Sequence, residues 1–225
     1  MTLERRRAVI IGVLFLVATA SYMAGSGMIE SVLETQDFLD QLLSSKATLL
    51  LGILLECVNI AAVVGIGVLM IPIVQQQNTV VAFGYAGSRI IEAALLTASE
   101  ISVLALIPVA GSASSAMSSD MQVLADFAVQ FRFASVNLAM LALGIGSLFL
   151  LYVFIVSRLI PRILSIIGVA GYISLLASVV LGMFGIDTGF ILFLPGAIFE
   201  VAFPVWLFVK GFSTTRMIQA QGNER

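Results

Sequence analysis

The sequence predicts an all-α, polytopic membrane protein built as a bundle of six transmembrane helices. Three observations carry this prediction: the composition, the lengths of the apolar stretches and the placement of the basic residues. Hydrophobic residues fill 60% of the 225 positions and charged residues only 11%, whereas about 25% of the residues of a typical soluble domain are charged. A chain with so little polar surface needs lipid as its main solvent.

The same composition excludes several classes of function. The net charge is −2 and the chain has no basic block, so nucleic-acid binding is not expected. Histidine is absent and Cys57 is the single cysteine, which excludes an intrachain disulfide and any Ser-His or Cys-His catalytic pair. We therefore predict no catalytic residue, no cofactor and no metal site, since a metal would have to be bound by oxygen ligands alone.

Six apolar stretches reach the roughly 20 residues that a helix needs to cross a bilayer. The fourth is longer than one span requires, so we expect its first turns to project from the bilayer. Short connections predict that successive helices are antiparallel neighbours, and all six belong to one integral membrane domain, residues 1–225. The stretches are 8–29, 47–73, 80–108, 124–156, 162–184 and 187–210.

The first connection, residues 30–46, differs from the others. Its apolar residues recur at helical spacing among acidic and polar ones, which predicts an amphipathic helix lying at the membrane interface. These residues are Val32, Leu33, Phe38, Leu39, Leu42 and Leu43.

Basic residues mark one side of the predicted bundle. With the N-terminus inside the cell, the cytoplasmic segments hold eight Lys or Arg residues, whereas the outer loops hold only Lys46. Because Lys and Arg are enriched in cytoplasmic segments, we predict a multi-pass protein of the inner (plasma) membrane with both termini cytoplasmic. The eight residues are Arg5, Arg6, Arg7, Arg158, Arg162, Lys210, Arg216 and Arg225.

The N-terminal stretch allows a second interpretation. The basic start, the apolar run and the Ala-Thr-Ala string at 18–20 resemble a secretory signal peptide, whose cleavage would leave five helices. The apolar run continues to Ala24, however, and this favours a retained span.

Four ionisable side chains fall deep within the predicted spans: Glu56, Arg89, Glu92 and Glu200. A charge at the centre of a membrane helix costs about 2.5–3.5 kcal/mol. At ~1.5 Å per residue, Arg89 and Glu92 lie ~10 and ~15 Å from the cytoplasmic side, Glu200 lies ~16 Å from the outer side, and Glu56 lies ~12 Å from the outer side. We predict that these four residues form a ligand-binding site.

Spacing predicts how the charges meet. Arg89 and Glu92 are three residues apart and can pair on one helix face, and we expect Glu200 to approach them. Glu100 continues the same stripe. Three deep carboxyl groups then face one guanidinium group, so either carboxyl groups hold protons or a cation or basic ligand is bound.

Each charge also has a purely structural interpretation. Arg89 and Glu92 would fix helix packing, Glu200 would be a protonated hydrogen-bonding residue, and Asn59 would satisfy Glu56 locally. We expect Arg132 to extend to the outer interface. Glu100 is expected close to that interface, within reach of water.

The last span contains two prolines. Pro195 and Pro204 remove the backbone donors that would bond the carbonyls of Ile191 and Glu200. A kink or local unwinding is therefore expected around Glu200. The small residues in GIGVL, LGIGS and GVAG are interpreted as helix-packing surfaces.

Three motifs together resemble a known family: GYAGSRIIEAALL at 84–96, SRLIPRILSIIGVAGYI at 157–173 and FEVAFPVWLFVKGF at 199–212. They are similar to the family called domain of unknown function 4386, whose members are bacterial and archaeal integral membrane proteins. The resemblance covers nearly the whole chain. It implies six helices and adds weight to Arg89, Glu92 and Glu200, but it implies no activity.

Three functions remain open at this point. The first is a small transporter or binder that holds a small ligand or cation at the Arg/Glu site. The second is a non-catalytic accessory protein, of a stress or immunity type, that acts through partners or lipids. The third is an intramembrane enzyme that uses carboxyl groups for acid–base chemistry. The lipid bilayer is the one partner that the composition requires, and the oligomeric state is left open.

Overall fold

The computed structural model describes residues 2–35, 38–112, 119–186, 188–189 and 191–213. The described residues form helices and connections, without a strand, which confirms the all-α prediction. Six helices are long and apolar enough to cross a membrane. The elements are α1 (Leu3–Leu33), α2 (Phe38–Leu42), α3 (Lys46–Val74), α4 (Thr79–Ser112), α5 (Ser119–Ser157), α6 (Arg162–Met183), the short 3₁₀ helix η1 (Ile191–Phe193) and α7 (Leu194–Val209).

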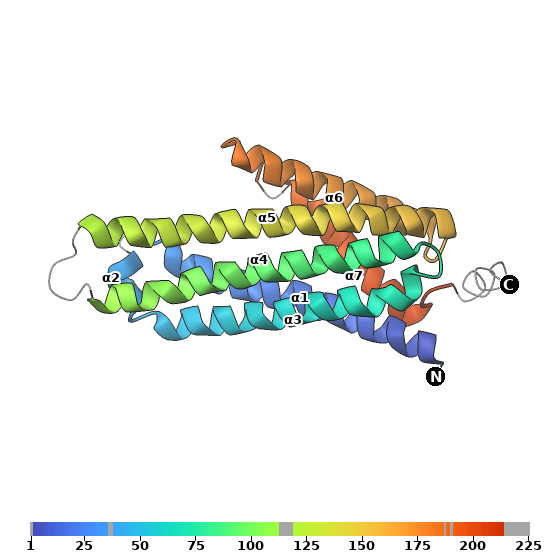
Figure 1. Cartoon of the computed structure of the whole chain (residues 1–225), viewed down its shortest axis with the longest axis horizontal. Helices are drawn as coiled ribbons and strands as arrows, with labels where there is room; N and C mark the ends of the chain where they lie inside the picture. Colours follow the sequence, from blue (N-terminus) through green and yellow to red (C-terminus); the bar gives the residue numbers. More distant parts are fainter. Residues whose placement is uncertain (1, 36–37, 113–118, 187, 190, 214–225) are drawn as a thin grey trace.

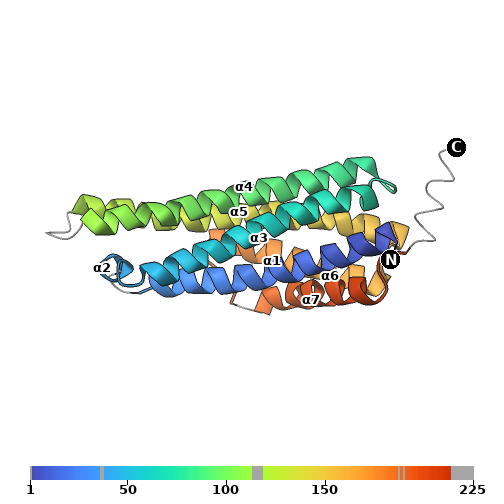
Figure 2. The same cartoon turned by 90° about the horizontal axis from the view of Figure 1, so that it is seen from below.

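The six long helices form a closed ring. Each packs against the next along the chain, in the order α1, α3, α4, α5, α6 and α7, and α7 closes the ring by packing on α1. Figures 1 and 2 show these helices running along the long axis of the molecule. Successive helices are therefore antiparallel neighbours, as the short connections predict.

The two ends of the bundle differ. The start of α1, the α3–α4 turn, the α5–α6 turn and the end of α7 lie at one end, and α2 lies at the other (Figure 1). We call these the termini end and the α2 end. The 39 residues of α5 span ~58 Å, against ~33 Å for the 22 residues of α6. Since a bilayer core is ~30 Å thick, part of α5 must project. Which compartment the termini end faces stays a prediction of the Lys/Arg bias.

The first connection is shorter and more buried than its composition predicts. Val32 and Leu33 belong to α1, and α2 has only five residues. Leu39 and Leu42 are buried in an apolar core at the α2 end, together with residues of α1, α3, α4 and α5. The five-residue helix α2 thus packs its apolar side chains into this end of the bundle.

A second, larger core fills the rest of the ring and draws residues from all six long helices. The two cores are separate. On α3, for example, Ile53 belongs to the core at the α2 end and Ala62 to the larger core. The polar residue Glu56 lies between them, and this interruption positions the site described below.

The last span begins later than predicted. The helix starts at Leu194, so Pro195 lies in its first turn, where a missing backbone donor costs little. The helix then continues across Glu200 to Val209. The local irregularity is the 3₁₀ turn Ile191–Phe193, which precedes Pro195, so the expected unwinding at Glu200 is wrong in position.

Small residues bring the helices close together, as their sequence motifs predict. A Cβ atom added at Gly171 of α6 would lie 2.7 Å from the Cα of Gly196 in α7. One added at Gly67 of α3 would lie 3.0 Å from the Cβ of Arg89. The backbones can approach to these distances because neither glycine carries a side chain.

Candidate functional site

The buried charges of the bundle fall into two clusters. The Arg89 cluster consists of Arg89 and Glu92 on α4 and Glu200 on α7. The Arg132 cluster consists of Arg132 on α5, Glu56 on α3 and Glu100 on α4. Along α4, Glu92 and Glu100 are eight residues apart, which corresponds to ~12 Å. The structure thus divides the four predicted residues between two places, and Glu56 does not join the other three.

In the Arg89 cluster the predicted pair is confirmed. Arg89 Nη1 lies 2.9 Å from Glu92 Oε2, and the two residues are only 4% and 3% exposed. The guanidinium carbon also lies 6.0 Å from the ring centroid of Tyr85, a cation–π distance. The ion contact is not a hydrogen bond, and among the described residues neither Glu92 Oε2 nor Arg89 Nε has a hydrogen-bond partner.

Glu200 reaches this pair only at longer range. Its Oε2 accepts a hydrogen bond of 2.9 Å from Thr19 Oγ1 of α1. It interacts electrostatically with Arg89 and Glu92, but no ion pair joins it to Arg89 among the described residues. Glu200 therefore lies near the pair as a neighbouring charge, but it makes no direct contact with Arg89.

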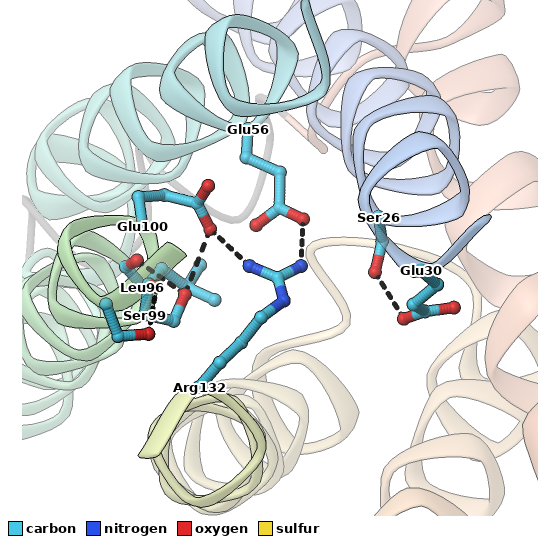
Figure 3. A network of polar contacts seen from close by, with 8 residues as sticks. Ser26, Glu30, Glu56, Leu96, Ser99, Glu100 and Arg132 are labelled. Carbon is cyan, nitrogen blue, oxygen red and sulfur yellow. Dashed lines mark hydrogen bonds and ion pairs between the residues drawn. The ribbon is translucent and has the colours of Figure 1, made fainter. Parts of the chain in front are cut away.

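The Arg132 cluster joins three helices through one guanidinium group. Arg132 Nη2 lies 2.7 Å from Glu56 Oε1, and Nη1 lies 2.6 Å from Glu100 Oε1. Figure 3 shows the guanidinium between the two carboxyl groups. The three residues are 2%, 0% and 3% exposed in the order Arg132, Glu56 and Glu100. Three expectations are wrong here: Arg132 does not extend to the interface, Glu100 is not in water, and Arg132 takes the place of Asn59 as the partner of Glu56.

The ion pairs leave part of each carboxyl group unused. Glu56 Oε2 and Glu100 Oε2 are buried and receive no hydrogen bond from a donor among the described residues, and the two carboxyl groups also interact with each other. Ser99 Oγ lies 3.0 Å from Glu100 Oε1 and 2.7 Å from the Leu96 carbonyl, and its single proton can serve only one of them. The cluster therefore holds two carboxyl groups, one cation and two spare acceptor oxygens.

Helix α1 packs against α3 beside the Arg132 cluster. A Cβ atom added at Gly25 would lie 2.8 Å from the Gly52 carbonyl oxygen and 2.9 Å from Glu56 Cγ. The absence of both side chains lets α1 lie directly on α3 at the level of Glu56. On the same helix, Ser26 Oγ donates a 2.7 Å hydrogen bond to Glu30 (Figure 3).

The clusters lie at different depths. Counted from the termini end, Arg89 and Glu92 lie ~15 and ~20 Å along α4, near the middle of a span. Glu56 lies ~27 Å along α3 and Glu100 ~32 Å along α4. The Arg132 cluster is thus a polar layer between the two apolar cores, and it lies nearer the α2 end than the Arg89 cluster.

Two cavities lie elsewhere in the bundle. One, of about 390 Å³, lies at the termini end and is lined by residues 158–162, Trp206 and residues 210–213. The other, of about 270 Å³, is an apolar groove between α4 and α5, lined by residues within 98–109 and 124–131. Neither lining includes Arg89, Glu92 or Glu200.

The family model described as Domain of unknown function (DUF4386) matches residues 10–211. The chain belongs to this family. Neither curated proteins nor solved structures show a significant match to this DUF4386 protein. With its six apolar helices, it is a multi-pass membrane protein whose family carries no assigned activity.

One feature of the sequence points to the Arg132 cluster. Within the predicted spans, Arg132 lies ~12 Å from residue 124, Glu56 ~14 Å from residue 47, and Glu100 ~12 Å from residue 108. All three distances are measured from the α2 end. Opposite charges at one depth on neighbouring helices are candidates for pairing, and this comparison would have linked the three residues.

Proposed function

We propose that this DUF4386 protein binds a small cation, a proton included, at its buried Arg/Glu clusters and carries it across the membrane. The observation that supports this is an excess of acid. The Arg132 cluster places two carboxyl groups against one guanidinium group, and the Arg89 cluster places one against its guanidinium group and a second at longer range. Three carboxyl oxygens have no hydrogen-bond partner among the described residues: Glu56 Oε2, Glu92 Oε2 and Glu100 Oε2.

The excess follows from charge balance. Arginine stays protonated in proteins, so each cluster with both carboxyl groups ionised carries a net charge of −1. An uncompensated charge in a low-dielectric interior costs several kcal/mol. One proton or one monovalent cation per cluster removes this charge and gives the spare oxygens a partner. A bound cation can leave again, because the carboxyl groups still have the guanidinium group as a partner after the cation has gone.

Cation binding is tested on the purified full-length chain in detergent. Its melting temperature is measured in Na⁺, K⁺, Li⁺ and choline chlorides of equal ionic strength, at pH 6 and pH 8. A cation at 100 times its Kd stabilises the folded state by ~2.7 kcal/mol. We expect one cation to raise the melting temperature above that in choline, and more at pH 8, where fewer protons compete.

Transport is tested in proteoliposomes that contain a pH-sensitive dye. An imposed cation gradient should drive a change of internal pH in the wild type and not in Glu92→Gln or Glu56→Gln. Glu34→Gln serves as the matched control, because Glu34 is exposed and follows the end of α1. The proposal fails if no cation changes either the melting temperature or the internal pH, or if Glu34→Gln abolishes the response as completely as the buried variants.

One observation favours a second candidate, the non-catalytic accessory protein. Arg89 and Glu92 are closed from solvent, and neither cavity described above reaches them. Under this second reading the clusters hold helices together and the surface of the bundle acts. A wild type that is stable and inserted in the membrane but silent in both assays supports this alternative.

A further inference from the structure

The cavity at the termini end is built from two segments that are far apart in the sequence. The α5–α6 turn, residues 158–162, forms one wall, and Trp206 with residues 210–213 after α7 forms the other. The backbone N–H of Ser213 donates a 3.0 Å hydrogen bond to the carbonyl of Leu159. Trp206 Nε1 donates a 3.1 Å bond to the carbonyl of Gly211. The Ser213–Leu159 bond joins the two walls, and the Trp206–Gly211 bond lies within the second wall.

The lining is strongly basic. Arg158, Arg162 and Lys210 all line the cavity, and none of the described lining residues is acidic. All three are exposed, and none forms an ion pair among the described residues. Three cations around a cavity of about 390 Å³ favour an anion as its occupant.

The backbone around these cations is specialised. Arg158 adopts a left-handed conformation with φ 55°, which is uncommon for a residue other than glycine. Gly211, opposite it, has φ 72°. Helix α6 also begins at the cavity. Its N-cap is Pro161, and no side chain caps the free backbone N–H groups of its first turn. Such N–H groups favour an anion and add to the charge of the three side chains.

Lys210 is free to take part because another residue serves the end of α7. Arg5 of α1 donates from Nη1 to the Leu207 carbonyl at 2.8 Å and from Nη2 to the Phe208 carbonyl. These carbonyls lie in the last turn of α7, where a basic side chain is favourable. Arg5 therefore serves the end of α7, and the Lys210 side chain is not needed there.

The surroundings of the cavity indicate what kind of anion it takes. Ile163 on α6 and Val209 on α7 border the cavity residues and are 75% and 65% exposed, as side chains facing acyl chains would be. Trp206 lies at the junction of this apolar surface with the basic rim, where tryptophan is enriched in membrane proteins. A ligand with an anionic head and apolar tails matches both surfaces.

We propose that this cavity binds the phosphate headgroup of an anionic phospholipid, with the acyl chains along α6 and α7. Basic pockets between transmembrane helices recognise such headgroups. The proposal is independent of the cation-binding function, since the cavity shares no residue with either charge cluster. It can therefore stand if that function fails, and the reverse also holds.

Trp206 makes the site directly observable, because it is the single tryptophan of the chain and lines the cavity. The full-length chain in a neutral detergent is titrated with phosphatidylglycerol, with phosphatidylcholine and with inorganic phosphate while tryptophan emission is recorded. We expect a saturable change with phosphatidylglycerol at concentrations where phosphatidylcholine has no effect. The apparent affinity should fall about 5-fold for each cation removed and about 25-fold in Arg158→Gln/Lys210→Gln.

Lys46→Gln is the matched control, because Lys46 is exposed at the start of α3, at the α2 end. It should titrate as the wild type does. An equal response to phosphatidylcholine would overturn the proposal, and so would an equal loss of affinity in Lys46→Gln. A full response to inorganic phosphate alone would also overturn it, because the ligand would then be a soluble phosphate and not a lipid.

Discussion

Removal of Arg132 should destabilise the protein in a way that depends on pH. In Arg132→Gln the carboxyl groups of Glu56 and Glu100 lose the partner that now lies 2.7 and 2.6 Å away. Both residues are almost fully buried, so water does not replace the guanidinium. Breaking a buried ion pair by removing one partner costs on the order of 3–5 kcal/mol.

The pH dependence follows from proton linkage. Without Arg132, the folded state holds protons on buried carboxyl groups that the unfolded chain releases near pH 4.3. The folded variant then binds more protons than the unfolded one, and its stability falls as the pH rises. The limit is ~1.4 kcal/mol per pH unit for each protonated carboxyl group. The stability gap to the wild type should therefore be small at pH 5 and widest at pH 8.

The assay is the melting temperature of wild type and Arg132→Gln in detergent from pH 5 to pH 8. For a chain of this size 1 kcal/mol corresponds to about 2–4 °C, so a loss of roughly 6–20 °C is expected at neutral pH. The triple variant Arg132→Met/Glu56→Gln/Glu100→Gln removes every charge of the cluster and should recover most of the loss. Equal melting temperatures for wild type and Arg132→Gln at pH 8 would refute the buried pairing.

Two further predictions concern the Arg89 cluster and the contact of α1 with α3. Glu92→Ala should lower the melting temperature more than Arg89→Ala, because it leaves a permanent cation without its partner, whereas carboxyl groups left without a partner can take up protons. Glu92→Gln should lower it less than either variant. Identical melting temperatures for wild type and all three variants would mean that the pair is solvated. Gly25→Ala should cost about 1–3 kcal/mol, because its Cβ would meet the Gly52 carbonyl oxygen at 2.8 Å. Gly27→Ala, with no atom within 4 Å of its added Cβ, is the control and should melt no lower than wild type.

The elements that depend on local sequence were predictable. A span needs ~20 apolar residues, and the six helices follow from that length. The Arg89–Glu92 pair follows from a spacing of three on one helix. Both features are determined by residues close together in the chain.

Pairing across helices was not predictable in the same way. Arg132 meets Glu56 and Glu100 only because α3, α4 and α5 are rotated to turn these faces together, and rotation depends on all contacts of the bundle. Arg132 would extend to the interface if its helix stood alone in lipid. In the bundle, two buried carboxyl groups within 3 Å are better partners than a distant interface. The displaced irregularity at Ile191–Phe193 has a similar origin, since Pro195 could be placed within the helix only once its first residue was known.

The glycine contacts give the two candidate functions different structural requirements. Gly25 and Gly52 bring α1 onto α3 beside Glu56, and Gly67 brings α3 onto α4 beside Arg89. Helices that touch at their backbones leave no path for an ion between them. A carrier therefore requires a second conformation in which α1 separates from α3 at Gly25, so that Glu56 is reached from one membrane surface. An accessory protein requires no such movement, because the closed ring is itself its functional conformation.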